Sequence, residues 1–169
     1  MGKQTAIVIA ALFFCCGAVA QNVSINLLVR NSGKVANNEN VFLEVTLCNM
    51  DAAVNVPPYR LKAQVSAPAS LVKMPMIGHE LPPGWRVAAA KEGQLWLSNG
   101  TDTLGAGECR TLLVVLRAVS VGGPSTVSGN LLFANGVAPG NITGVPLPGD
   151  SPADNHSTST VEVIRVLRK

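Results

Sequence analysis

The chain has 169 residues, of which 47% are hydrophobic and 14% charged, and its formal net charge is +3. This length allows one domain. The charged residues form no long run of a single sign, which excludes an electrostatic nucleic-acid binder, because such proteins cluster lysine and arginine.

The N-terminal segment 1–20 has the three parts of a secretory signal peptide. Lys3 supplies the positive charge, residues 6–14 are apolar, and Ala18-Val-Ala20 offers small residues for cleavage before Gln21. A membrane anchor is the alternative, but this apolar run is short for a span of about 20 residues. A lipoprotein cysteine at 15 or 16 lacks small residues before it. We expect a single secreted domain at 21–169, extracellular or periplasmic, with no membrane span after cleavage.

Alternating apolar and polar residues predict strands in the first half of this domain. Residues 23–29 alternate, and a polar loop follows at 31–40. In the next strand, 41–48, four apolar residues point one way: Val41, Leu43, Val45 and Leu47. Another alternating set begins at Tyr59 and runs to 65. Four prolines between 67 and 84 predict an irregular segment or a sheet edge.

The second half is organised around the apolar run 110–118, which turn-forming residues flank on both sides. Its length and its valine and leucine content predict a strand buried on both faces at the centre of a sheet. Residues 85–88 and 94–98 predict a hairpin, and further strands are expected at 126–133 and 158–167. The loop 135–155 could hold a short strand at 142–145. Seven or eight short antiparallel strands predict an all-β, immunoglobulin-like β-sandwich.

Two cysteines, Cys48 and Cys109, remain after removal of the signal peptide. Cys48 lies on the face of its strand opposite the apolar set. If Leu112, Val114 and Leu116 face the core, Cys109 likewise lies on the opposite face of its own strand. If the two strands pair side by side and antiparallel, the end of one meets the start of the other and the cysteines become neighbours. An exported chain favours a disulfide here, worth about 4 kcal/mol through loop closure. Two unpaired thiols are the alternative.

Four Asn-x-Ser/Thr sequons are candidate glycosylation sites if the source is eukaryotic. They are at Asn22, Asn99, Asn141 and Asn155.

An ordered set of turn motifs resembles a known family. The motifs are residues 81–85 (Leu-Pro-Pro-Gly-Trp), 95–97, 104–108 (Leu-Gly-Ala-Gly-Glu) and 152–155 (Pro-Ala-Asp-Asn). The chain between 41 and 163 resembles the immunoglobulin-like "domain of unknown function eleven", common in exported and cell-surface bacterial proteins. The resemblance implies an extracellular structural or adhesive role. In the first of these motifs, we expect Leu81 to pack into the core before a Pro-Gly turn.

Catalytic chemistry has little support in the sequence. The histidines, His79 and His156, are far apart, and no nucleophile elbow is present, so we expect neither an enzyme nor a bound cofactor. Met74, Met76 and His79 could bind a soft metal such as Cu(I), although methionines in an apolar loop more often fill the core. Asp150, Asp154 and Asn155 could offer oxygens to Ca²⁺, although turn capping is the simpler explanation for these residues.

Two function classes remain. Trp85, Trp96 and Tyr59 could stack on sugar rings if they are exposed together, and core packing is the alternative. The mature chain is also rich in apolar residues, which predicts a surface for a protein partner or for self-association, including strand addition at a sheet edge. We expect a secreted protein-contact domain, with a carbohydrate-binding module as the alternative.

Overall fold

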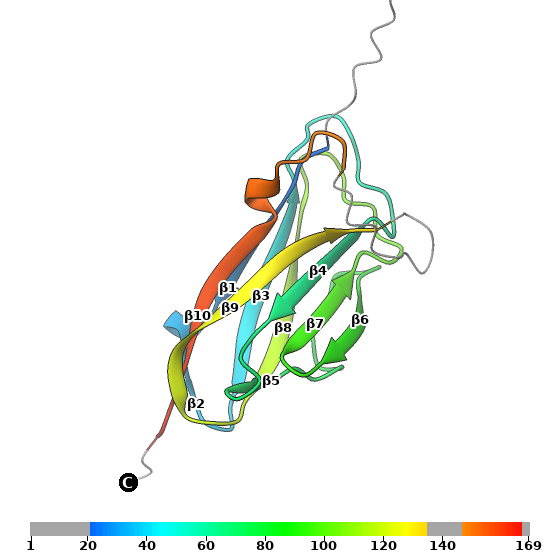
Figure 1. The fold of residues 1–169 in the computed structure, drawn as a ribbon. Helices are drawn as coiled ribbons and strands as arrows, with labels where there is room; N and C mark the ends of the chain where they lie inside the picture. The colour runs from blue at the N-terminus through cyan, green and yellow to red at the C-terminus, as the bar shows by residue number, and fades with distance from the viewer. Residues whose placement is uncertain (1–20, 135–146, 167–169) are drawn as a thin grey trace, which may run out of the picture.

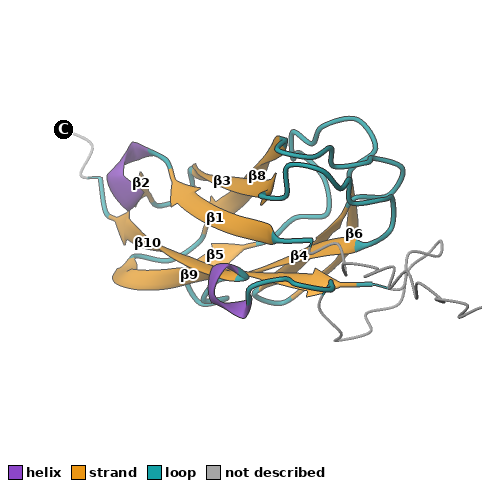
Figure 2. Ribbon diagram, turned by 90° about the horizontal axis from the view of Figure 1, so that it is seen from above, coloured by secondary structure: helices purple, strands orange, loops and turns teal. Residues whose placement is uncertain are grey.

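The structure, a computed structural model, describes residues 21–134 and 147–166. Two β-sheets pack face to face, as Figures 1 and 2 show. The smaller sheet has the order β1 (Val23–Val29), β3 (Asn40–Asn49), β8 (Cys109–Ala118) and β5 (Val72–Lys73). The larger sheet has the order β2 (Lys34–Ala36), β10 (His156–Ile164), β9 (Gly122–Phe133), β4 (Leu61–Ser66), β7 (Gln94–Ser98) and β6 (Arg86–Lys91). Two 3-10 turns lie at Asn31–Gly33 and Pro152–Asp154.

The expected all-β, immunoglobulin-like sandwich is confirmed, with two differences in its strands. The described residues form ten strands rather than seven or eight, because β2 and β5 are too short to show alternation. One pair, β2 with β10, is parallel. The strand expected from Tyr59 begins at Leu61, since Tyr59 adopts a positive φ of 59°. The possible strand at 142–145 lies outside the described residues.

The core lies between the two sheets and is built by period-two alternation. On β3 the inward residues are Val41, Leu43, Val45 and Leu47, which are fully buried as predicted. They pair in register with Leu112, Val114 and Leu116 of β8, also fully buried. Leu81 packs against this cluster from its turn. The apolar faces of both sheets therefore form one continuous core.

The run 110–118 occupies the predicted central position, because β8 lies between β3 and β5. Its predicted burial on both faces is wrong. Leu113 and Val115 on the outward face are half-buried, while Thr111 and Arg117 on the same face are exposed. In a sandwich, the opposite sheet covers only the inward face of each sheet. The outward side chains of Leu113 and Val115 are instead covered in part by the segment before β6. Glu80 pairs with Leu113 there.

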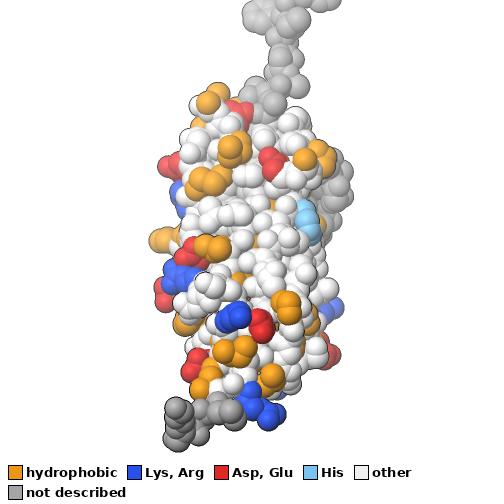
Figure 3. Space-filling model, turned by 90° about the vertical axis from the view of Figure 1, so that its left-hand side faces the viewer, with side chains coloured by type: hydrophobic (Ala, Val, Ile, Leu, Met, Phe, Trp, Pro, Cys, Tyr) orange, Lys and Arg blue, Asp and Glu red, His pale blue; other side chains and the backbone are white. Residues whose placement is uncertain are grey.

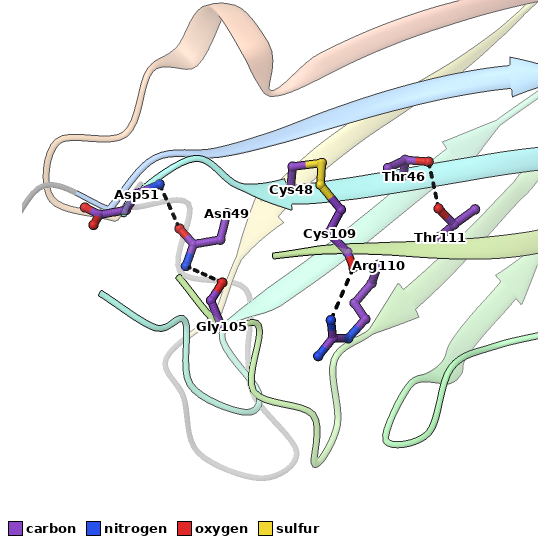
Figure 4. The surroundings of a disulfide bond; sticks show 8 residues. All are labelled: Thr46, Cys48, Asn49, Asp51, Gly105, Cys109, Arg110 and Thr111. Carbon is purple, nitrogen blue, oxygen red and sulfur yellow. Dashed lines mark hydrogen bonds between the residues drawn. A yellow bond between two sulfur atoms is a disulfide. The ribbon is translucent and has the colours of Figure 1, made fainter. Parts of the chain in front are cut away.

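The predicted cysteine pair is confirmed. Cys48 and Cys109 face each other directly across β3 and β8, with their Cα atoms 4.1 Å apart, and form a disulfide (Figure 4). The bond lies on the outward face, as the parity of the two strands predicts. It joins residues 61 positions apart in sequence.

Candidate functional site

The disulfide lies beside a buried asparagine that fixes the turns at this end of the sandwich (Figure 4). The Asn49 side chain is 1% exposed. Its Nδ2 donates to the carbonyl oxygens of Val54 at 2.7 Å and of Gly105 at 3.1 Å, and its Oδ1 accepts from the Asp51 N–H. The loop after β3 and the loop before β8 therefore share one buried amide. The sequence analysis missed Asn49, because a single polar residue at the end of an apolar strand looks like an ordinary strand terminus.

The sequon asparagine Asn99 has the same structural role. It is fully buried, its Oδ1 accepts from the Leu61 N–H at 3.0 Å, and its Nδ2 donates to the carbonyls of Pro57 and Asp102. A glycan on this nitrogen would replace a buried hydrogen bond and has no space. In the folded domain the Asn99 amide is therefore occupied by the protein's own backbone groups, and glycosylation at this position stays a prediction.

The sequon asparagines Asn22 and Asn155 hold the segment before β10 against the start of β1. Asn22 Nδ2 donates to Asp154 Oδ2 at 3.1 Å, and Asn22 Oδ1 accepts from the Ser151 N–H at 3.0 Å. Asn155 Nδ2 donates to Asp150 Oδ2. Both side chains are half-buried rather than projecting into solvent. The fourth sequon, Asn141, lies outside the described residues.

Asp150 serves as an acceptor for the protein's own N–H groups. Its Oδ1 accepts from the backbone N–H of Val23 at 3.0 Å, and its Oδ2 accepts from Asn155. Partial burial raises the pKa of Asp150, and these hydrogen bonds and the nearby Asp154 charge modify the shift. This use of both oxygens is that of a turn cap. No group of three or more acidic, histidine or cysteine side chains within the described residues could hold a metal ion.

The Met74, Met76 and His79 cluster does not present a free imidazole. His79 Nε2 lies 2.9 Å from the Pro75 carbonyl oxygen, and its Nδ1 accepts from the Val115 N–H at 3.1 Å. The ring therefore replaces a strand partner for β8, with the proton on Nε2. Met74 packs against the core, while Met76 is 52% exposed. Each ring nitrogen already has a protein partner, which disfavours the copper hypothesis.

The three aromatic residues do not form a common platform. Trp85 is 6% exposed, and its Nε1 donates to Asp102 Oδ2 at 2.8 Å. The Arg86 guanidinium lies over the Tyr59 ring, with its Cζ atom 5.9 Å from the ring centroid. Trp96 is half-buried on the outward face of β7. A sugar platform of all three residues is therefore absent, since Trp85 has no free ring face.

One long side of the sandwich is closed by side chains. The outer edge of β1 faces β10 of the other sheet, where the hydroxyls of Ser157 and Ser159 accept from the N–H groups of Leu27 at 3.0 Å and Val29 at 3.1 Å. A side chain at Gly129 would place its Cβ 2.1 Å from a Leu27 methyl group, so glycine lets the sheets approach here. Figure 3 shows this side, with hydrophobic groups scattered among polar ones. Strand addition at β1 is therefore prevented.

The opposite long side is open. Within the described residues, β6 has a strand neighbour on one side only, β7. Beside it, a hollow of about 430 Å³ opens between the edges of the two sheets, lined by Val72, Met74, Met76 and Ala90. We call this the inner hollow. In Figure 1, β6 lies at the end of its sheet, away from β10.

Two solved structures show the same fold. The CARDB domain of the PF1109 protein from Pyrococcus furiosus, in complex with di-metal ions, is 16% identical with a TM-score of 0.52, covering 88% of this chain and 97% of that chain. A cohesin module from a family 33 glycoside hydrolase of Clostridium perfringens is 8% identical with a TM-score of 0.57, covering 86% and 100%. These likenesses show the fold alone. No protein-family model and no curated protein matches the chain.

No helix within the described residues is long and apolar enough to cross a membrane.

Proposed function

We propose that this chain is an exported, non-enzymatic immunoglobulin-like domain that acts by contacting other proteins at a cell surface, in a matrix or in an appendage. One observation carries the proposal: the two long sides of the sandwich differ. The β1 edge is sealed by Ser157 and Ser159, whereas β6 has no second strand neighbour among the described residues and lies beside a hollow lined partly by apolar side chains. Edges of this kind are usually protected unless they are used.

Several features of the chain support export. Segment 1–20 has the composition of a signal peptide. Cys48 and Cys109 form a disulfide, which persists in oxidising compartments outside the cytosol. The motif resemblance to a family of exported and cell-surface domains agrees with this location. We therefore place the mature domain outside the cell or in a periplasm.

A contact role is also supported by how the histidines are used. His79 has both ring nitrogens engaged with backbone groups. The exposed His156 lies beside Asn130, with Nδ1 2.8 Å from its Oδ1. In the described part of the chain, no carboxylate hydrogen-bonds to either imidazole, the arrangement that orients a catalytic base.

Photo-crosslinking in the producing cells tests this function. A photoreactive residue is placed at one of three exposed positions: Ile77 beside the inner hollow, Asn26 on β1 or Thr158 on β10. We expect an adduct with another protein, identified by mass spectrometry. If none of the three positions yields a protein adduct, the contact role is wrong. Binding of the purified domain to a glycan array would then support the carbohydrate-binding alternative.

A further inference from the structure

The backbone of β6 is oriented for pairing with another strand. The β6–β7 hairpin turns through two residues, Glu92 and Gly93, between the paired residues Lys91 and Gln94. In such a hairpin the flanking pair shares hydrogen bonds, and the next pair along does not. The N–H and C=O groups of Ala90 therefore point away from β7. They face the open edge of the sheet.

A hollow lies on each side of β6. The inner hollow, about 430 Å³, includes Ala90, whose side chain packs against the core. The second, which we call the outer hollow, is about 290 Å³ and is lined by Lys62, Ala88, Ala89, Lys91 and Trp96. Trp96 alternates with the fully buried Leu95 and Leu97, which places this hollow on the outward face of the larger sheet.

An added strand would reach both hollows at once. Successive side chains of a strand point to opposite faces of its sheet. A segment paired with β6 would thus direct alternate side chains into the inner hollow and the remaining ones toward the outer hollow. Alanine, valine and methionine form the apolar part of the inner hollow, next to Lys73, Lys91 and Glu92, so an apolar side chain of the added strand can pack there. Methionine adapts readily to side chains of different shape.

The charge of this edge defines the partner further. The linings of the two hollows contain Lys62, Lys73 and Lys91 against a single acidic residue, Glu92. Arg86 lies exposed at the other end of β6. A second copy that paired antiparallel along the full length of β6, centred between Ala88 and Ala89, would set Arg86 of one chain opposite Lys91 of the other. Like charges in that position are destabilising, so a copy of this chain is a poor occupant.

We propose that the β6 edge binds an extended segment of another protein, in which apolar residues alternate with aspartate or glutamate. The apolar side chains enter the inner hollow, the carboxylates meet lysines that line the two hollows, Lys73 and Lys91 among them, and the two backbones form a ladder. This inference rests on the proposed contact function and names the chemistry of the partner.

Binding of a designed peptide tests the proposal. The probe is a fluorescent peptide of about eight residues that alternates valine or leucine with aspartate or glutamate, titrated with the mature domain and followed by anisotropy. An interface this small is expected to be weak, with a dissociation constant of tens to hundreds of micromolar. We expect no binding when lysine replaces the acidic residues, and none when the backbone nitrogens of alternate residues are methylated. Equal binding of the methylated peptide would overturn strand addition.

Matched variants locate the site. In the double variant Lys73→Ala with Lys91→Ala, affinity for the probe is expected to fall at least tenfold. Lys34→Ala with Arg165→Ala removes the same charge near the other edge of the larger sheet and should leave affinity unchanged. All four positions are exposed, so folding is expected to persist and is checked by circular dichroism.

The possible results distinguish failure of the docking edge from failure of the proposed protein-contact function. Protein adducts from Asn26 or Thr158, together with no binding of the probe, would overturn the docking edge and leave the contact function in place. No protein adduct from any position would remove both. Concentration-dependent dimers that the Lys73 and Lys91 substitutions alter would assign the edge to a second copy and overturn the acidic partner.

Discussion

Substitution of Asn99 separates a structural role from a glycosylation role. Two changes remove the same sequon: Asn99→Ala deletes the buried amide, and Thr101→Ala alters an exposed residue two positions later. If the amide matters as a hydrogen-bonding centre, only the first variant should be destabilised. If the sequon matters only as a glycan acceptor, neither variant should lose stability when no glycan is added.

The magnitude follows from the contacts of the Asn99 side chain. Its loss leaves the Leu61 N–H without an acceptor and two carbonyl oxygens, of Pro57 and Asp102, without this donor. An unsatisfied buried group costs about 1–3 kcal/mol, and each lost neutral hydrogen bond contributes roughly 1 kcal/mol. We expect Asn99→Ala to lower the free energy of unfolding by about 3 kcal/mol. In a domain of this size that corresponds to a fall of roughly 10 °C in Tm.

Urea unfolding of both variants, produced by a host that adds no glycans, provides the assay. Thr101→Ala should match the unsubstituted protein within about 0.5 kcal/mol, as is usual for surface changes. A loss below about 1 kcal/mol in Asn99→Ala would refute the reasoning, because the buried amide would then contribute no more than a surface group. So would an equal loss in both variants.

Three further predictions concern other contacts. Replacing Ser157 and Ser159 together by alanine removes the acceptors of two β1 N–H groups, so stability should fall by roughly 2 kcal/mol in urea unfolding and light scattering should detect association at the newly open edge. Because burial raises the pKa of Asp150, its contribution to stability is fully present below the ordinary value of 3.8 and is lost as pH rises through the raised pKa. Stability profiles between about pH 3 and pH 7 should show this trend against Asp150→Asn, and a constant difference would contradict it. Replacing Cys48 and Cys109 together by serine should lower the free energy of unfolding by about 4 kcal/mol, because the unfolded chain gains conformational entropy when its loop is no longer closed. A loss below about 1 kcal/mol in urea unfolding would show that the crosslink adds little.

The predictable part of the fold is the part set by local alternation. The residues 41–48 alternate in a way that fixes which side chains face the core. This parity, together with the expectation that this strand pairs antiparallel with the apolar run 110–118, predicted that Cys48 and Cys109 would meet. The strands β2 and β5 were missed because two or three residues cannot show a period. The burial of β8 was overestimated, since an apolar run does not reveal whether its outward face is covered as well as its inward face.

The hydrogen bonds that close the molecule were out of reach of sequence reasoning. Ser157 bonds to Leu27, 130 residues away, and Asn99 bonds to Leu61, 38 residues away. A serine on a strand or an asparagine in a sequon carries no local signal of such a partner. The aromatic residues show the same limit, because Trp85 and Trp96 have similar apolar neighbours in sequence, yet one is buried and the other borders a hollow.

An open edge is a hazard for a β-sheet protein, which explains the combination of features at β6. Lysines and arginines at a sheet edge discourage pairing with an identical edge, as does the irregular register between Val87 and Ala89. On the β1 side the chain removes the hazard entirely by supplying hydroxyl acceptors from β10. At β6 it keeps the backbone groups and adds positive charge instead. That choice excludes copies of itself while leaving the edge attractive to an acidic strand, which is what a selective contact requires.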